Sequence, residues 1–307
     1  MTAAEAAASG TAGQTHEPIR LSTRLGGFIE LTKPGIVRMV LITAGAGFFL
    51  AAGTALEVLV LLHTLFGMGL VASGACGLNE YVEREADARM NRTADRPIPS
   101  GRVAPRDALL FSVALSVFGL VHLVAFVNTV TAALVALTLL SYVLVYTPMK
   151  RHTWTATLVG AVPGALPILA GWTAGGGAID PAGLSLFAIL FFWQMPHFYA
   201  LAWIYRADYA RGGFRMLTTI DAGGARTGRQ IVLFGAALLV ASVLPTLLGI
   251  SGRLYAVVAI LLGTAFLALG VGMALRRDDR RAMRLFLGSV AYLPLLLITM
   301  VIDRLIA

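Results

Sequence analysis

The sequence predicts an all-α, polytopic membrane protein with nine transmembrane helices. Hydrophobic residues make up 58% of its 307 residues and charged residues only 13%, a balance outside the usual range of soluble domains. An apolar run of roughly 18 residues or more can cross about 30 Å of hydrocarbon as a helix. Nine such runs lie near residues 36–55, 57–78, 107–127, 129–147, 155–174, 183–205, 229–250, 254–275 and 285–303.

The basic residues sort to one side of this nine-span topology. With the N-terminus inside, 22 of the 24 lysines and arginines fall on inner segments, and only Arg253 and Arg304 fall on outer ones. Short cytoplasmic loops collect lysine and arginine, and a wrong helix count would scramble the sorting. We therefore expect a multi-pass protein of the cell (plasma or inner) membrane with a cytoplasmic N-terminus. The net charge of +8 follows from this topology and does not indicate nucleic-acid binding.

The part before the first span divides into two segments. Residues 1–22 are mostly Ala, Gly, Thr and polar residues without the pattern of a signal peptide, which predicts a disordered tail. Residues 23–34 (TRLGGFIELTKP) predict a short amphipathic helix on the membrane surface that stops at Pro34. The remainder, 23–307, is predicted to form one transmembrane domain.

The second span ends in the polar stretch NEYVEREADARMNRTADRPIPSGR, residues 79–102. Asn79, Glu83 and Asp87 follow one another at intervals of four residues, which places them on one helix face within an arc of about 80°. An amide inside an apolar span is costly and usually functional. The alternative interpretation is a solvated helix end whose carboxylates balance the neighbouring arginines.

Basic side chains follow these oxygens in the sequence. Arg92, Arg96 and Arg102 lie around the rigid RPIPSG turn, and Lys150 and Arg151 come directly after the fourth span. Mg²⁺ prefers oxygen ligands, and arginine binds phosphate oxygens with its forked guanidinium. The combination predicts a Mg²⁺–diphosphate site at the inner end of the bundle, with a lipid tail among the spans.

The fifth and sixth spans carry further signals. Pro163 and Pro167 predict a kinked fifth span, whose small residues permit close helix approach or leave room for a bulky ligand. The sixth span and its inner end, FFWQMPHFYALAWIYRADYARGGFRML (191–217), hold His197 in mid-membrane and Tyr205 and Asp208 near the end. His197 is either a satisfied core histidine or a group for ligand binding or proton transfer.

These motifs resemble a known family. Asn79-x-x-x-Glu83-x-x-x-Asp87 followed by RTADRPIPSG is similar to the first aspartate-rich motif of the UbiA-type intramembrane prenyltransferases. The segments LTKPGIV (31–37), YTPMKRHTWTAT (146–157), PGALPILAGW (163–172) and WQMPHFYALAWIYRADYARGGFRML (193–217) resemble the protoheme IX farnesyltransferase (heme O synthase) branch. The resemblance covers roughly residues 30–300.

The resemblance implies a nine-helix UbiA-type bundle with a central cavity open to the cytoplasmic side. It implies farnesyl diphosphate and heme b as substrates, Mg²⁺ as cofactor, and a heme A synthase as a candidate partner. The implied roles are catalysis for Asn79, Glu83, Asp87, Asp208 and His197; metal binding for Asn79, Glu83, Asp87 and Asp208; diphosphate binding for Arg92, Arg96, Lys150 and Arg151; and lining of the heme and prenyl pocket for Tyr146, Trp193, His197 and Tyr205.

Two positions depart from the family pattern. Glu83 stands where the family usually has Asp, and Tyr205-x-x-Asp208 replaces the paired aspartates of quinone-pathway relatives, so the number of metal ions stays open. Two other functions remain as alternatives: a prenyltransferase for a quinone or other aromatic acceptor, and, more distantly, a transporter. A transporter should carry polar groups across the whole bundle, whereas here they gather at one end.

Overall fold

The computed structural model describes residues 21–53 and 55–306, which form helices and no strand. Most of the predicted tail, residues 1–20, lies outside the described residues, and Leu21 already belongs to the first helix. The helices are α1 (Leu21–Leu31), α2 (Pro34–Ala52), α3 (Val58–Asp87), α4 (Pro105–Phe126), α5 (Thr129–Leu140), the π-helix η1 (Ser141–Tyr146), α6 (Thr147–Met149), α7 (Ala156–Ala174), α8 (Pro181–Ile204), α9 (Arg206–Arg211), α10 (Leu217–Ile220), α11 (Ala225–Leu247), α12 (Arg253–Arg276) and α13 (Asp279–Ile306).

Nine helical segments of the described chain are long and apolar enough to cross a membrane. They follow the order of the nine predicted spans, so the all-α, multi-pass fold class is confirmed. The second span differs from its apolar run, because α3 continues beyond residue 78 and ends only at Asp87. The polar motif therefore lies on the last turns of a spanning helix, and not in a loop.

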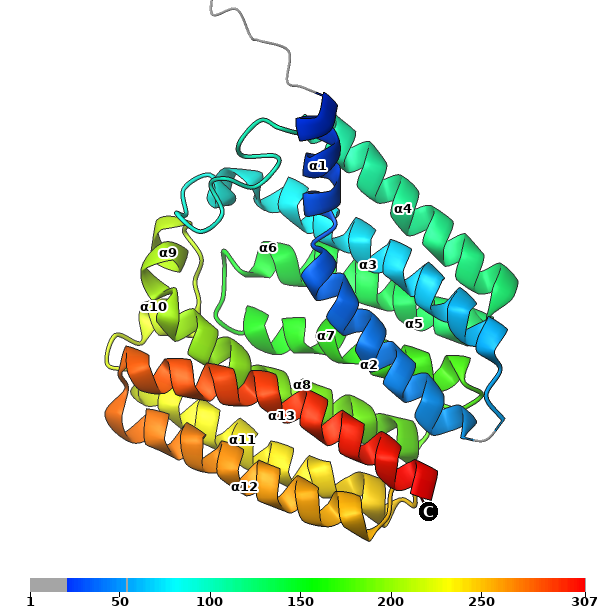
Figure 1. Ribbon diagram of the computed structural model, residues 1–307. Coiled ribbons are helices and arrows are strands. Elements are labelled where there is room, and N and C mark those ends of the chain that lie inside the picture. Colours follow the sequence, from blue (N-terminus) through cyan, green and yellow to red (C-terminus); the bar gives the residue numbers. More distant parts are fainter. Residues whose placement is uncertain (1–20, 54, 307) are drawn as a thin grey trace, which may run out of the picture.

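The junction of α1 and α2 has an unusual backbone. Pro34 occupies the first turn of α2, where its fixed φ and missing N–H cost nothing. Lys33, directly before it, has a left-handed conformation with φ 50° and ψ 65°. Among the described non-glycine residues, Lys33 is the one that adopts the left-handed region of φ. Figure 1 shows α1 and α2 meeting at an angle at this point.

Glycines bring particular helices into close contact. A Cβ added at Gly171 of α7 would overlap the carbonyl oxygen of Ala44 in α2, and one at Gly47 of α2 would overlap the carbonyl oxygen of Ile168. The same holds between α3 and α4, where a Cβ at Gly74 would collide with Ser116. Helix α7 runs unbroken through both of its prolines. The small residues of the fifth span therefore serve close helix packing.

The spans form a bundle whose polar connections collect at one end (Figure 1). Helices α11, α12 and α13 lie along one side, next to α8, while α3, α4 and α5 lie on the opposite side. Helix α7 is the most buried span and contacts α2, α5 and α8. The connections 88–104, 150–155 and 205–224 all lie at the same end of the bundle, which we call the loop end.

Candidate active site

The polar face of α3 is buried at the loop end. Asn79, Glu83 and Asp87 lie on the same helix, as their spacing predicts, and their exposed fractions are 3%, 4% and 0%. A solvated helix end would leave such side chains exposed. Burial of two carboxylates and an amide is costly unless other groups satisfy them, so their partners decide what this face can do.

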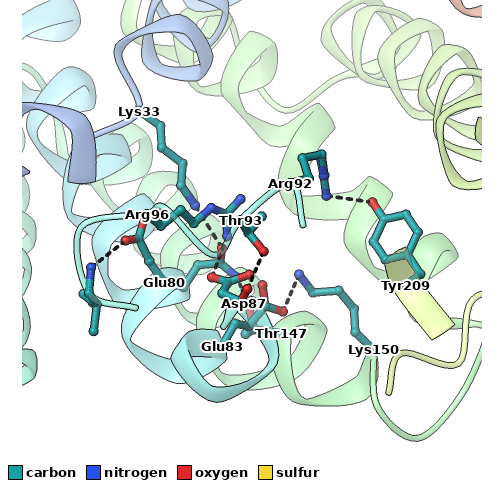
Figure 2. Close-up of polar contacts among 12 residues, drawn as sticks. Lys33, Glu80, Glu83, Asp87, Arg92, Thr93, Arg96, Thr147, Lys150 and Tyr209 are labelled. Carbon is teal, nitrogen blue, oxygen red and sulfur yellow. Dashed lines mark hydrogen bonds and ion pairs between the residues drawn. The ribbon is translucent and has the colours of Figure 1, made fainter. Parts of the chain in front are cut away.

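A cation from another segment meets each of these three side chains, and Figure 2 shows those that meet Glu83 and Asp87. Lys33 Nζ donates to Asn79 Oδ1 at 3.3 Å. Lys150 Nζ lies 2.5 Å from Glu83 Oε1, and Arg96 Nη1 donates to Asp87 Oδ2 at 2.6 Å. Lys33 and Lys150 are the only two lysines of the chain. The buried oxygens are thus matched by positive charges from the α1–α2 junction, the 88–104 loop and the segment after α6.

The 88–104 loop is fastened to α3 by further polar contacts. Thr93 Oγ1 donates to the backbone oxygen of Asp87 at 2.9 Å. Glu80, itself 1% exposed, accepts a hydrogen bond from the backbone N–H of Ile98 at 3.3 Å. These contacts hold the RPIPSG turn in place, and with it the guanidinium of Arg96 beside Asp87.

The segment after α8 closes the same site from the other side. The guanidinium of Arg92 lies over the rings of Tyr205 and Tyr209, 4.8 Å and 5.6 Å from their centroids, which is a cation–π geometry. Its Nη2 lies 3.5 Å from the hydroxyl of Tyr209. Asp208 is buried and forms an ion pair with Arg211 on the same short helix α9.

The fourth span changes helix type where it reaches the site. Residues Ser141–Tyr146 form the π-helix η1, and such turns are frequent at functional sites. Tyr146, at its end, lies under the ammonium of Lys150 with 4.7 Å from Nζ to the ring centroid. Thr147 accepts a hydrogen bond from Asn79 Nδ2 at 3.1 Å. The end of the π-helix and the first residue of α6 therefore present a ring and a hydroxyl to the α3 face.

The ion pairs fix the charge state of the two cations that lie outside the spans. Burial is the largest single influence on the pKa of Lys150 and lowers it, but Glu83 together with Tyr146 and Tyr209 leaves the pKa above its ordinary value. Burial likewise lowers the pKa of Arg96, and Asp87 together with Glu80 and Glu83 more than compensates. Both side chains are therefore protonated at neutral pH, as a site for an anionic group requires.

A second cluster surrounds His197 within α8. Its Nδ1 lies 2.7 Å from Ser289 Oγ of α13, and the Trp193 ring stacks on the imidazole at 4.9 Å. Trp193 Nε1 donates to the backbone oxygen of Ser289 at 2.8 Å, and Phe286 lies 5.0 Å from the imidazole. Among the described residues no hydrogen bond joins this cluster to the α3 face. His197 is thus held by one nitrogen, with Nε2 left for another partner.

Comparison with known proteins identifies the family. Residues 40–296 match the UbiA prenyltransferase family. The chain belongs to this family. It is 49% identical over 286 residues to the protoheme IX farnesyltransferase of Solibacter usitatus (strain Ellin6076), covering 90% of the chain and 98% of that protein. It is 39% identical over 294 residues to the protoheme IX farnesyltransferase of Koribacter versatilis (strain Ellin345), covering 92% and 95%.

Solved UbiA-type structures share the fold. A digeranylgeranylglyceryl phosphate synthase superposes with a TM-score of 0.79 at 17% identity, covering 92% of this chain and 99% of that chain. A UbiA homolog from Archaeoglobus fulgidus, bound to GPP and Mg²⁺, superposes with a TM-score of 0.67 at 14% identity, covering 89% and 99%. At these identities the likeness establishes the UbiA bundle, whereas the site must be argued from its own residues.

The residues predicted for the UbiA site fall into two groups. At the α3 face, four of the predicted metal-binding and phosphate-binding residues form two pairs, Asp87 with Arg96 and Glu83 with Lys150. Tyr146 and Tyr205 belong to the same group, because their rings pack against Lys150 and Arg92 and not against His197. Trp193 and His197 form the separate cluster on α8. Arg151 is half-buried, and its side chain makes no hydrogen bond or ion pair within the described chain.

Several polar residues of this UbiA site are missing from the sequence-based set. They are Lys33, Glu80, Thr93, Thr147, Tyr209 and Ser289. Lys33 could have been noticed in the sequence, because a lysine directly before a proline and between two predicted helices lies at a position with a restricted backbone. Glu80 lies on α3 itself, directly after Asn79, but falls outside the series spaced by four residues. Thr93, Thr147, Tyr209 and Ser289 lie on the 88–104 loop, α6, α9 and α13, and no spacing rule connects them to α3.

The side-chain oxygens of the α3 face supply some, but not all, of the ligands that Mg²⁺ needs. Asp87 Oδ1 is buried and accepts no hydrogen bond in the described part of the chain, which leaves a hard oxygen free for a cation. Asn79 and Glu83 offer further oxygens, each already facing a lysine. The described residues contain no group of three acidic, histidine or cysteine side chains placed to hold a metal by themselves. A metal at this face therefore needs additional oxygens, such as those of a diphosphate.

Proposed function

We propose that this protein transfers the farnesyl group of farnesyl diphosphate to a vinyl group of heme b, giving heme O and diphosphate. The identity of 49% to a protoheme IX farnesyltransferase, over 90% of the chain, carries the choice of substrates. The buried carboxylates and cations at the end of α3 support the diphosphate chemistry. The heme side of the proposal draws on the cluster around His197.

The α3 face would bind the diphosphate. Mg²⁺, when bound, would neutralise charge on the leaving group, and Asn79, Glu83, Asp87 and Asp208 are its proposed ligands. Arg92, Arg96, Lys150 and Arg151, with Lys33 added from the structure, would contact the phosphate oxygens. Lys33, Arg92, Arg96 and Lys150 are held in position by their partners, so they need little rearrangement as charge develops.

The reaction balances as one ionisation and two additions. The bond between farnesyl C1 and oxygen breaks, and the diphosphate leaves with the electron pair. The terminal vinyl carbon of heme b bonds to farnesyl C1, water adds to the other vinyl carbon, and one proton is released. The rings of Tyr146 and Tyr205 lie beside the cations that would hold the diphosphate, where they can shelter the allylic cation.

His197 would act on the heme. Because Ser289 occupies Nδ1, Nε2 is the nitrogen available to the iron or to a proton. We expect His197→Ala to shift the absorption spectrum of bound heme or to weaken heme binding at least about tenfold, whereas the exposed His152→Ala should change neither. An unaltered spectrum and affinity in His197→Ala would remove the heme role without deciding the reaction.

The direct test is product formation. The purified protein is incubated with heme b, farnesyl diphosphate and Mg²⁺, and heme O is sought by mass spectrometry. Asp87→Ala should lower the rate by about 100-fold or more, because it removes an oxygen needed where charge develops. Asp95→Ala, an exposed carboxylate in the same loop region, is the matched control and should keep the rate. Absence of heme O at every Mg²⁺ concentration would refute the proposal.

We also propose that the loop end faces the cytoplasm across the inner membrane. The concentration of lysine and arginine at this end supports that orientation. In a Cys76→Ser background, Ser100→Cys should stay unlabelled by an impermeant maleimide on intact cells, and Ala178→Cys should be labelled. The reverse result would invert the topology.

We further propose that heme O is released toward a membrane partner such as a heme A synthase. Co-purification of the two proteins tests this proposal.

A further inference from the structure

A groove between α11 and α12 lies outside the proposed active site. It has a volume of about 620 Å³ and opens on the surface of the bundle. None of its lining residues belongs to the α3 face or to the His197 cluster. It is lined by Ala225, Gly228, Arg229, Val232, Leu233, Ala236, Ala274 and Arg277.

The groove has apolar walls made by small and branched residues. Gly228 allows α11 to approach α12 so closely that an added Cβ would lie 3.0 Å from the Cα of Ala274. Farther along, Val232 and Ala236 continue the wall, and Leu233 is 61% exposed. These residues lie within spanning helices, so the groove faces hydrocarbon along its length. Its shape and chemistry suit an acyl chain.

Two arginines stand at the loop end of this groove. Arg277 donates from Nη1 to the backbone oxygen of Gly223 at 2.8 Å and from Nε to that of Ala274 at 3.0 Å, which fixes its position and leaves Nη2 without a hydrogen bond in the described chain. Arg229 is exposed and forms no ion pair with any described residue. Both charges are therefore available to a ligand.

The surroundings add to the positive charge. Arg226, Arg276, Arg280 and Arg284 also form no ion pair within the described ranges. The nearby carboxylates are already engaged. Asp221 caps α11 by accepting from the N–H of Thr227 at 2.8 Å, Asp278 pairs with Arg281, and Asp279 pairs with Arg206. No carboxylate lines the groove, so it lacks the oxygen ligands of a Mg²⁺–diphosphate site.

We infer that this groove is a binding site for an anionic phospholipid. Its phosphate would lie on Arg229 and Arg277, and one acyl chain would follow Val232 and Ala236 between α11 and α12. Basic pockets between spanning helices at one membrane face are suited to anionic headgroups. The helix N-terminus is not the anchor, because Asp221 already caps it. The charge complementarity and the apolar groove together select a lipid over a free anion.

Native mass spectrometry of the delipidated, detergent-solubilised protein tests the site. Phosphatidylglycerol is titrated against the zwitterionic phosphatidylcholine of the same chain length. The unmodified protein should retain phosphatidylglycerol in preference. Each arginine contributes about fivefold in affinity, so Arg229→Gln should lower phosphatidylglycerol binding about fivefold and the Arg229→Gln/Arg277→Gln double variant about 25-fold.

Two controls separate this site from general charge effects. Arg253→Gln/Arg304→Gln removes two exposed charges at the other end of the bundle and should leave the lipid preference unchanged. Ala236→Phe fills the groove without altering charge and should weaken both lipids. Equal binding of the two lipids, or equal losses in both double variants, would overturn the inference. Prenyl transfer and the size-exclusion profile should be normal in Arg229→Gln, which reports that the variant is folded.

Discussion

Each cation of the α3 face has a structural partner, and this sets the cost of altering it. Lys150 and Glu83 have side-chain exposures of only 11% and 6%. A buried charge that loses its partner keeps its desolvation cost and gains nothing in return. Substitutions at these positions therefore change stability as well as ligand binding, and a single variant cannot separate the two effects.

A double-mutant cycle on Lys150 and Glu83 separates the effect of this pair on stability from its effect on ligand binding. Lys150→Met leaves Glu83 buried and unpaired, so the free energy of unfolding should fall by about 3–5 kcal/mol. Glu83→Gln/Lys150→Met should recover most of that loss, because neither side chain is then charged. Diphosphate binding should stay weak in both. Thermal unfolding in detergent and pyrophosphate titration measure the two quantities, and an undiminished stability of Lys150→Met would contradict the paired role.

Lys33 combines a strained backbone with a side chain that reaches the site. A left-handed conformation costs a non-glycine residue about 1–2 kcal/mol, which glycine does not pay. We expect Lys33→Gly to unfold at a temperature no lower than Lys33→Met, while both bind pyrophosphate at least about tenfold more weakly than the unmodified protein. Retention of full pyrophosphate affinity in either variant would exclude Lys33 from the site.

At the scale of whole elements, helices α2 and α7 pack backbone against backbone, and we expect them to behave as one rigid pair. The carbonyl oxygen of Ala44 occupies the position that a side chain on Gly171 would need, and that of Ile168 does the same for Gly47. Neither position can adjust by a rotamer change, since the obstacle is backbone. The packing therefore depends on glycine at these points, more than on the hydrophobicity of the spans.

Alanine substitutions on these helices test the close packing. Gly171→Ala must push α2 and α7 apart and should destabilise the protein by about 3 kcal/mol or more. Gly35→Ala is the matched control in α2, because nothing lies within 4 Å of its added Cβ, and it should be neutral or slightly stabilising. Thermal unfolding in detergent compares the two variants. Equal unfolding temperatures would contradict the proposed rigid pair.

Over the whole molecule, sequence and structure agree best where one periodic signal dominates. Nine long apolar runs and one-sided charge predicted the spans, and spacing by four placed Asn79, Glu83 and Asp87 on one buried face. Arg96 and Lys150 were predicted at this site, but their individual partners and the presence of Lys33 were not, because these contacts depend on the tertiary fold. His63 and His122 likewise lie apart in the sequence, yet their Nδ1 and Nε2 atoms are 3.1 Å apart.

Local backbone irregularities could also not be predicted from the sequence. The π-helix Ser141–Tyr146 has an ordinary apolar composition, and only the structure shows that it directs Tyr146 under Lys150. The prolines of α7 predict a kink, and the helix runs from Ala156 to Ala174 with both prolines inside it. Such features depend on neighbouring helices, which a single-sequence pattern cannot represent.

The matching of acids by bases at the α3 face makes the proposed metal and its anion thermodynamically interdependent. A lone divalent ion would add charge to a nearly neutral site, and a lone diphosphate would add the opposite charge. Each should therefore raise the affinity of the other, by equal factors in both directions. Calorimetric titration of Mg²⁺ with and without pyrophosphate should show weak binding alone and at least about tenfold tighter binding together. Such a site would load its metal and substrate as a complex, and it would stay unreactive toward either one in isolation.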